Sequence, residues 1–159
     1  MTARVWSGIL GAAVLLLIAA PGTLVAQGPP GGGGPSANVT VAPPDILFPA
    51  PAQLDFEAGW VEHGGVSITI EPRNKNRQNW QLFVQASAAD MGGYGKPVND
   101  ILVRVQGSAS WAPLGTTAQL LAEGSGATTV TVYYRLALDW TLDAPGTYSV
   151  PIEYTSTSF

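Results

Sequence analysis

The residues of this chain that could carry out chemistry are few and scattered. The single histidine, His63, follows Glu62 and precedes two glycines, and Asp55 and Glu57 lie a few residues before it. A hydrolase needs a nucleophile with its base, or an acid and a base held together, and this spacing provides neither. A calcium site needs several oxygen ligands that converge from a defined loop, a spacing that is also missing. We therefore interpret this stretch as a solvated turn.

Composition narrows the possible chemistry further. The chain has no cysteine, so it has no thiolate metal ligand, no cysteine nucleophile and no disulfide. Six basic residues follow residue 26, against all eleven acidic residues, which gives this part a formal net charge of about −5. Nucleic-acid binding relies on clustered cations, so an acidic chain argues against that class of partner. We expect a protein that is not an enzyme and that holds no metal and no other cofactor.

Basic and aromatic side chains in predicted connections are the remaining candidates for contact with a partner. One connection holds the only basic cluster, Arg73, Lys75 and Arg77. These cations could contact an anionic polymer or an acidic patch, although such a run more often forms a solvated loop. Three aromatic residues also lie in connections: Trp60, Tyr94 and Trp111. Exposed aromatic rings can stack on sugars or anchor a partner protein, and the alternative is that they cap the ends of the core.

The elements that would position these residues are strands. Seven apolar residues occupy every second position near the end of the chain: Val130, Val132, Tyr134, Leu136, Leu138, Trp140 and Leu142. Because successive side chains of a strand point to opposite faces, this pattern predicts one long strand over 128–142 with one buried face. Shorter alternating runs predict further strands over 39–41, 54–56, 66–70, 80–86, 101–105, 117–121 and 148–154.

The spacing of these runs predicts the fold class. About seven to nine short strands are separated by turns rich in glycine and proline, and no convincing helical period follows residue 26. We therefore predict an all-β fold, an antiparallel β-sandwich of immunoglobulin-like character, with a closed barrel as the alternative. Pro151 has no backbone N–H to donate, so the last strand should be an edge strand or be interrupted there.

The first 37 residues are typical of an exported protein. Arg4 precedes the apolar run Ile9–Ala20, and Ala26 is a small residue at a plausible cleavage position, so residues 1–26 read as a secretory signal peptide. The run is too short to span about 30 Å of hydrocarbon, which argues against an uncleaved anchor. Residues 27–37 form a linker rich in glycine and proline, and 38–159 form one domain. We expect a secreted or cell-surface protein that meets a membrane only during export.

Two Trp-x-Leu tripeptides carry a resemblance to a known family. They lie at 80–82 and 140–142, and the second ends the segment Tyr134-Arg135-Leu136-Ala137-Leu138-Asp139-Trp140-Thr141-Leu142 before Pro145. This pattern resembles the WxL domain of bacterial cell-surface proteins over roughly residues 66–145. Pro145 comes one residue sooner than in that family, and the chain continues past it. Its final Pro-Gly-Thr-Tyr turn and strand are similar to pilin-type exported sandwich domains.

Both motifs have a structural interpretation and a functional one. Trp80 shares a strand face with Leu82, and Trp140 shares one with Leu142, so the alternation predicts that all four pack in the core. The resemblance implies a module that associates non-covalently with cell-wall polymer or with another surface protein. A structural subunit of a surface filament, assembled through edge-strand pairing or the N-terminal arm, is the alternative. A secreted enzyme or its carbohydrate-binding accessory is a third hypothesis.

Overall fold

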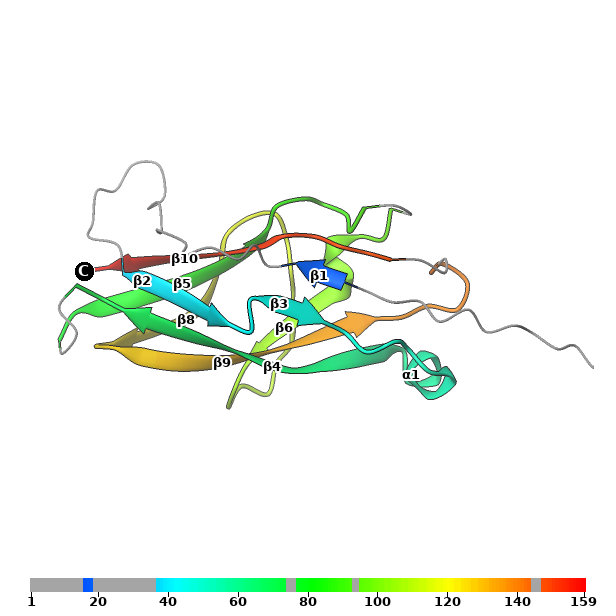
Figure 1. Cartoon of the computed structure of the whole chain (residues 1–159), viewed down its shortest axis with the longest axis horizontal. Coiled ribbons are helices and arrows are strands. Elements are labelled where there is room, and N and C mark those ends of the chain that lie inside the picture. The colour runs from blue at the N-terminus through cyan, green and yellow to red at the C-terminus, as the bar shows by residue number, and fades with distance from the viewer. Residues whose placement is uncertain (1–15, 19–36, 74–76, 93–94, 144–146) are drawn as a thin grey trace, which may run out of the picture.

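The protein folds as two antiparallel sheets that face each other. The computed structural model describes residues 16–18, 37–73, 77–92, 95–143 and 147–159, and Figure 1 shows the arrangement of its elements. The larger sheet has the strand order β2 (Asn38–Ala42), β4 (Trp60–Glu71), β9 (Thr128–Ala137), β6 (Ile101–Val105) and β7 (Ala112–Pro113). The smaller sheet has the order β10 (Ile152–Ser158), β5 (Asn79–Ala86) and β8 (Gln119–Ser125). The predicted all-β sandwich is confirmed.

One cluster of apolar side chains fills the space between the two sheets. The inward residues of β4, β5 and β9 form its centre, among them Val66, Ile68, Ile70, Trp80, Leu82, Val84, Val132, Tyr134 and Leu136. Tyr134 of β9 and Tyr154 of β10 meet across the sandwich, where their buried hydroxyls hydrogen-bond each other. Burial of an aliphatic or aromatic side chain is worth about 1.5–3 kcal/mol, so this alternation of apolar residues supplies the main stabilisation of the fold.

The segment around His63 is part of a strand, so its interpretation as a solvated turn is wrong. β4 continues through it, and its register against β9 shifts between His63 and Val66. Gly65 has a φ of +109° at this bulge, a conformation that side chains other than glycine rarely adopt. Val61 before the bulge and Val66 after it are both buried. The register shift at the bulge therefore lets both side chains face the core, although they are an odd number of residues apart.

Three other predicted elements differ in the structure. Residues 54–56 belong to a short helix, α1 (Gln53–Ala58), rather than to a strand. The Asp55 carboxylate accepts a hydrogen bond from the Ala52 N–H at 2.7 Å, and Gly59 ends the helix at a φ of +79°. The strand expected over 117–121 is β8, which runs over 119–125, and β9 ends at Ala137 instead of 142.

The last strand agrees with the prediction made from Pro151. β10 begins directly after the proline and runs over Ile152–Ser158, rather than over 148–154 as predicted. Among the described strands it pairs with β5 alone, at the edge of the smaller sheet. The other predicted strands correspond to β2, β4, β5 and β6. A 3-10 turn, η1 (Val98–Asp100), leads directly into β6.

Part of the predicted signal peptide forms a strand. β1 (Leu16–Ile18) pairs antiparallel with β3 (Asp45–Leu47), in a small sheet of its own. The predicted cleavage position and residues 27–36 lie outside the described residues. Within the described ranges, no helix has the length and apolar character that a membrane crossing requires.

Candidate functional site

The loop that follows β9 exposes two large apolar side chains. Trp140 is 53% exposed and Leu142 is 81% exposed. The alternation predicts both as core residues, and the structure overturns this because the strand stops before it reaches them. By contrast Trp80 and Leu82, the other Trp-x-Leu pair, are buried in β5 as predicted. We call residues 139–143 the WTL loop.

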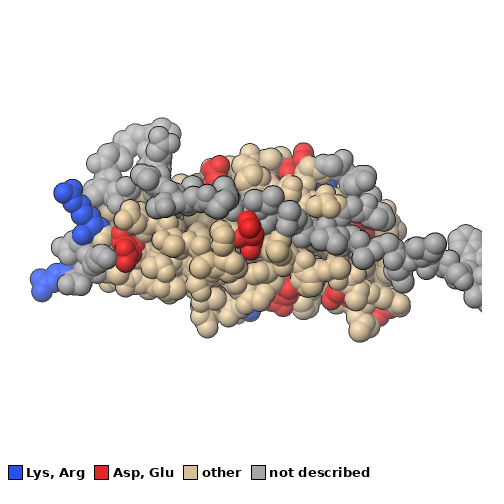
Figure 2. Space-filling model, viewed as in Figure 1, with Lys and Arg blue, Asp and Glu red and all other residues tan. Residues whose placement is uncertain are grey.

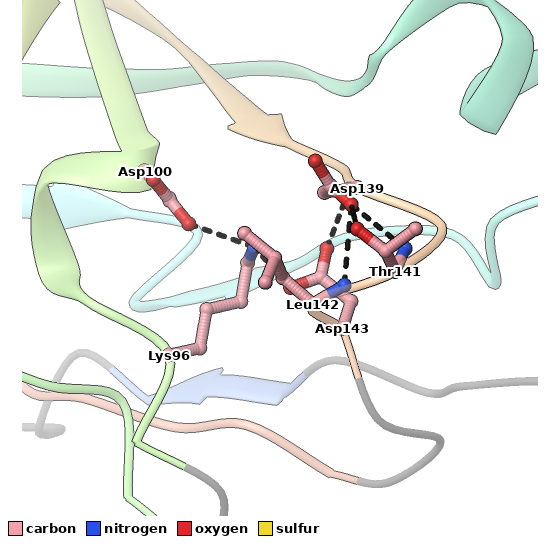
Figure 3. Close-up of polar contacts among 6 residues, drawn as sticks. All are labelled: Lys96, Asp100, Asp139, Thr141, Leu142 and Asp143. Carbon is pink, nitrogen blue, oxygen red and sulfur yellow. Dashed lines mark hydrogen bonds and ion pairs between the residues drawn. The ribbon is translucent and has the colours of Figure 1, made fainter.

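Hydrogen bonds from two aspartates fix the WTL loop (Figure 3). One oxygen of Asp139 accepts from the Thr141 N–H at 2.7 Å, the Thr141 hydroxyl at 2.6 Å and the Leu142 N–H at 3.1 Å. Asp143 accepts from the Asp139 N–H at 2.9 Å. The Thr141 hydroxyl and N–H are the main causes of the lowered pKa of Asp139. These local bonds compete with strand pairing, so the backbone turns and the apolar side chains leave the core.

A buried lysine attaches the WTL loop to the rest of the molecule. Lys96 is only 6% exposed, and its Nζ donates to Asp143 Oδ1 at 2.6 Å and to Asp100 Oδ2 at 2.8 Å. Figure 3 shows the ammonium between the two carboxylates. Burial lowers the pKa of Lys96, but hydrogen bonds and charges from Asp100 and Asp143 raise it by more, so the net pKa lies above its ordinary value. The loop is therefore held by charged hydrogen bonds as well as by its own backbone.

Helix α1 lies beside the WTL loop. The Phe56 ring stacks on the Trp140 indole, with ring centroids 4.3 Å apart and an angle of 28° between the planes. Leu54, two residues earlier in α1, is 74% exposed. This end of the sandwich therefore presents large apolar side chains from two segments, and contacts between them order Trp140. Ordered apolar surface of this kind is typical of contact sites.

A second candidate site covers the outer face of the larger sheet. We call it the Trp–Arg cluster, and its members come from β4, β6, β9 and the segment before β7: Trp60, Glu62, Arg104, Trp111, Tyr133 and Arg135. The Arg135 guanidinium lies 3.7 Å from the Trp60 ring centroid and 4.3 Å from that of Trp111. The Arg104 guanidinium lies 4.6 Å from the Trp111 centroid and 5.4 Å from that of Tyr133. Strand pairing places these rows side by side.

Charge in the Trp–Arg cluster is only partly balanced. Glu62 contacts Arg135 at 3.5 Å and Arg104 at 4.0 Å, so two guanidinium groups share one carboxylate. The Nε atoms of both arginines are buried and make no hydrogen bond within the described residues. Stacking on aromatic faces stabilises the guanidinium groups. With two guanidinium groups and one carboxylate, the cluster carries a small excess of positive charge on an acidic protein.

The residues predicted as surface contacts are only partly brought together. Trp60 and Trp111 meet on either side of Arg135, although Trp60 begins β4 and does not lie in a connection as predicted. Arg73 and Arg77 are exposed in the connection between β4 and β5, at the end of the molecule opposite α1 (Figure 1). Figure 2 shows cations projecting at that end. Lys75 and Tyr94 lie outside the described residues.

The surroundings of His63 do not form a catalytic arrangement in the described part of the chain. Its Nδ1 accepts a hydrogen bond from the Gly65 N–H at 3.2 Å, and its ring lies edge-on to Phe48, with centroids 6.1 Å apart. Burial lowers its pKa. Glu62 is engaged by the arginines on the opposite face. No group of three His, Cys, Asp or Glu side chains among the residues described could hold a metal ion.

Sequence reasoning missed the residues that fix both sites. Arg104 and Arg135 fall on the outward positions of their strands, so the alternation places them on the outer face without predicting that they meet two tryptophans. Lys96 lies in a turn rich in glycine and proline, and its partners come from η1 and from the WTL loop. No local pattern identifies such a group, because its members are adjacent only after three segments have folded together.

Known proteins do not assign either site. No protein-family model matches this chain, and no curated protein sequence is similar to it.

Proposed function

We propose that this protein is an exported, non-catalytic binding module that attaches to cell-wall polymer or to another surface protein through the WTL loop. The observation that carries the proposal is that Trp140 and Leu142 are both exposed and fixed in place. Exposure of apolar side chains to water is unfavourable. The hydrogen bonds to Asp139 nevertheless hold these two side chains at the surface. A partner that covers these side chains would gain the free energy that their exposure costs.

Preorganisation supports the same proposal. The loop is fixed by bonds to Asp139 and Asp143, by the ammonium of Lys96 and by the stack of Phe56 on Trp140. A partner would therefore meet an already ordered apolar surface and would lose little free energy in ordering it. Tryptophan at the centre of such a surface is typical of binding hot spots.

Co-sedimentation with isolated peptidoglycan tests the wall-binding form of this proposal. We expect the full chain to pellet with the polymer, and the double variant Trp140→Ala, Leu142→Ser to lose most of that binding. Leu120→Ser is the matched control, because Leu120 is 51% exposed on β8 and outside the loop. Replacing Arg73, Lys75 and Arg77 with glutamine tests the contact predicted from the sequence. Pelleting that is equal in the wild type and the double variant would contradict a role for the loop.

A structural subunit remains the second candidate, and one pairing favours it. Among the described residues, the only strand that pairs with β3 is β1, which lies in the predicted signal peptide. Cleavage during export would leave the β3 edge open, and an open edge accepts a strand from a neighbouring chain.

Measurement of molar mass by light scattering tests this alternative. Chains cleaved after Ala26 should form oligomers whose mass rises with concentration. Leu47→Lys, which places a charge on the β3 edge, should return them to monomers. Monomers of the cleaved wild type at every concentration would contradict the subunit hypothesis.

A further inference from the structure

The Trp–Arg cluster has more hydrogen-bond donors than acceptors. Each guanidinium carries several N–H groups, and among the described residues Glu62 is the carboxylate that contacts both Arg104 and Arg135. Its oxygens lie 4.0 Å and 3.5 Å from the two arginines, farther than in an ordinary N–H···O hydrogen bond of about 2.9 Å. The Nε atoms of both arginines are buried without a partner in the described part of the chain. Both guanidinium groups therefore keep donor capacity that the protein does not use.

Aromatic rings hold the two guanidinium groups and leave their edges available. The Trp60 and Trp111 ring centroids lie 3.7 Å and 4.3 Å from the Arg135 guanidinium, and Arg104 stacks on Trp111 and Tyr133. A ring above a guanidinium covers its flat face, whereas the N–H bonds point outward in the plane. The side chains of Arg104 and Arg135 are 30% and 22% exposed. Solvent, and hence a ligand, therefore reaches both arginines.

The bulge in β4 helps to shape this face of the sheet. A Cβ on Gly65 would lie 3.1 Å from Cε1 and 3.3 Å from Cδ1 of Tyr133, so the glycine lets the tyrosine ring lie close to the backbone. Bulges are over-represented next to functional sites, where they change the direction of side chains. The bulge that lets Val61 and Val66 both face the core therefore also makes room for the cluster on the outer face.

The charge of the cluster fits one group with a single negative charge. Two guanidinium groups and one carboxylate leave one positive charge in excess. The whole chain has a formal net charge of −4, which repels a polymer of high charge density. Short-range contact with a single oxyanion is therefore favoured over long-range attraction of a polyanion. Glu62 contacts both arginines, so one carboxylate can approach the two guanidinium groups together.

We propose that the Trp–Arg cluster binds the carboxylate of a uronic acid residue in a glycan. The planar edge of a guanidinium matches a carboxylate in two parallel N–H···O bonds, which are shorter than the contacts that Glu62 makes. Trp60, Trp111 and Tyr133 are each partly exposed, so their rings offer apolar contact to the C–H groups of the sugar. The cluster is separate from the WTL loop, so this inference does not depend on binding by that loop.

Isothermal titration calorimetry of the full chain tests the proposal with a tetrasaccharide of alternating glucuronic acid and neutral sugar units. We expect saturable binding, and the methyl ester of the same tetrasaccharide should bind about tenfold more weakly because it has no charge. No saturable binding of the acid would overturn the proposal. Equal binding of the ester would overturn the role of the carboxylate. Tighter binding of glycerophosphoglycerol, a phosphodiester with one negative charge, would overturn the assignment to a uronic acid.

A charge-matched pair of variants tests whether the sugar binds at the cluster. Arg135→Gln should weaken binding of the tetrasaccharide by about tenfold. Arg77→Gln is the matched control, because it removes the same charge from an exposed residue at the opposite end of the molecule, and it should bind like the wild type. Equal weakening by both variants would overturn a defined site, since it would reflect net charge alone.

Glu62→Gln tests the same site by a gain of affinity. It removes the carboxylate that competes for both arginines, so we expect about threefold tighter binding of the tetrasaccharide. A folded Glu62→Gln protein that binds no more tightly than the wild type would overturn the use of these donors by the ligand. This variant also keeps the test decisive if Arg135→Gln fails to fold. Failure of the sugar titration leaves the peptidoglycan co-sedimentation result unaffected, so the two proposals can fail separately.

Discussion

The two Trp-x-Leu motifs have the same residues at the same spacing and opposite environments. Trp80 is 2% exposed in the middle of the core, whereas Trp140 is 53% exposed in a loop. Trp80 begins an alternating run of apolar residues, and Trp140 lies near the end of another. The alternation alone therefore does not distinguish a buried tryptophan from an exposed one. The difference lies in their neighbours. Trp80 lies within β5, a strand that pairs on both sides, whereas Trp140 lies between two aspartates that bond to the backbone around it.

The comparison shows how a few polar bonds redirect an apolar sequence. Trp80 also satisfies its one polar group inside the core, because its indole N–H donates to the Gly126 carbonyl at 2.8 Å. Trp140 instead stacks on Phe56 at the surface. One motif therefore contributes to folding, and we propose that the other contributes to binding.

Replacing Trp80 should give the largest effect of any single change in either motif. Trp80→Ala would leave a cavity between the sheets and an unpaired carbonyl at Gly126. We expect the free energy of unfolding to fall by about 3–5 kcal/mol, enough to unfold a domain of ordinary stability. Denaturant titration followed by circular dichroism measures it. A loss below about 1 kcal/mol would contradict the burial of this motif.

Alkaline pH should lower the free energy of unfolding, because two tyrosines are buried in the same core as Trp80. Burial raises the pKa of both Tyr134 and Tyr154, so the folded state keeps protons that the unfolded state loses above about pH 10. Stability is therefore full below that pH and falls above it, by about 1 kcal/mol per pH unit for each tyrosine. Urea titrations between pH 9 and about 11 measure the slope. Tyr154→Phe should make it shallower, and an unchanged slope would argue against the buried pair.

Gly124 tests how closely the core fits Trp80. A Cβ at this position would lie 2.5 Å from the Trp80 ring, closer than side chains tolerate. We expect Gly124→Ala to lower the free energy of unfolding by about 1–3 kcal/mol through overpacking. Gly64→Ala is the matched control, since a Cβ there meets nothing within 4 Å. Thermal melts of the two variants compare them, and equal melting temperatures would show that the contact is unimportant.

Replacing Trp140 should have the smallest effect on stability. Trp140→Ala loses one exposed stack with Phe56, which is worth about 0.5–1.5 kcal/mol. We expect a loss of about 1 kcal/mol or less in the same denaturant titration, together with the loss of polymer binding described above. A loss as large as that of Trp80→Ala would mean that Trp140 is part of the core.

Much of the sandwich could be predicted because its signal is local. Apolar residues at every second position of β4, β5, β6 and β9 report directly on a buried face. The end of β9, helix α1 and the bulge at Gly65 were harder to predict, because each depends on a few side-chain hydrogen bonds or on one unusual backbone angle. The apolar alternation continues past Asp139, so it does not indicate that the strand ends before this residue.

The candidate sites depend even more on the tertiary structure. Trp60 and Trp111 were identified as aromatic residues of interest, but their meeting around Arg135 follows from strand order. No local sequence pattern identifies Lys96, because its surroundings are made by segments far apart in the chain. Burial of a charged side chain is visible only after those segments are placed.

Hydrogen exchange of the indole N–H groups tests the central claim most directly. Nuclear magnetic resonance resolves these protons, and the variants Trp80→Phe and Trp140→Phe assign them. We predict that the Trp80 indole exchanges only when the protein unfolds, because it is buried and bonded to Gly126. The Trp140 indole should exchange at the rate of a solvent-exposed side chain. Equal protection of the two indoles would contradict the separation into an inner and an outer motif.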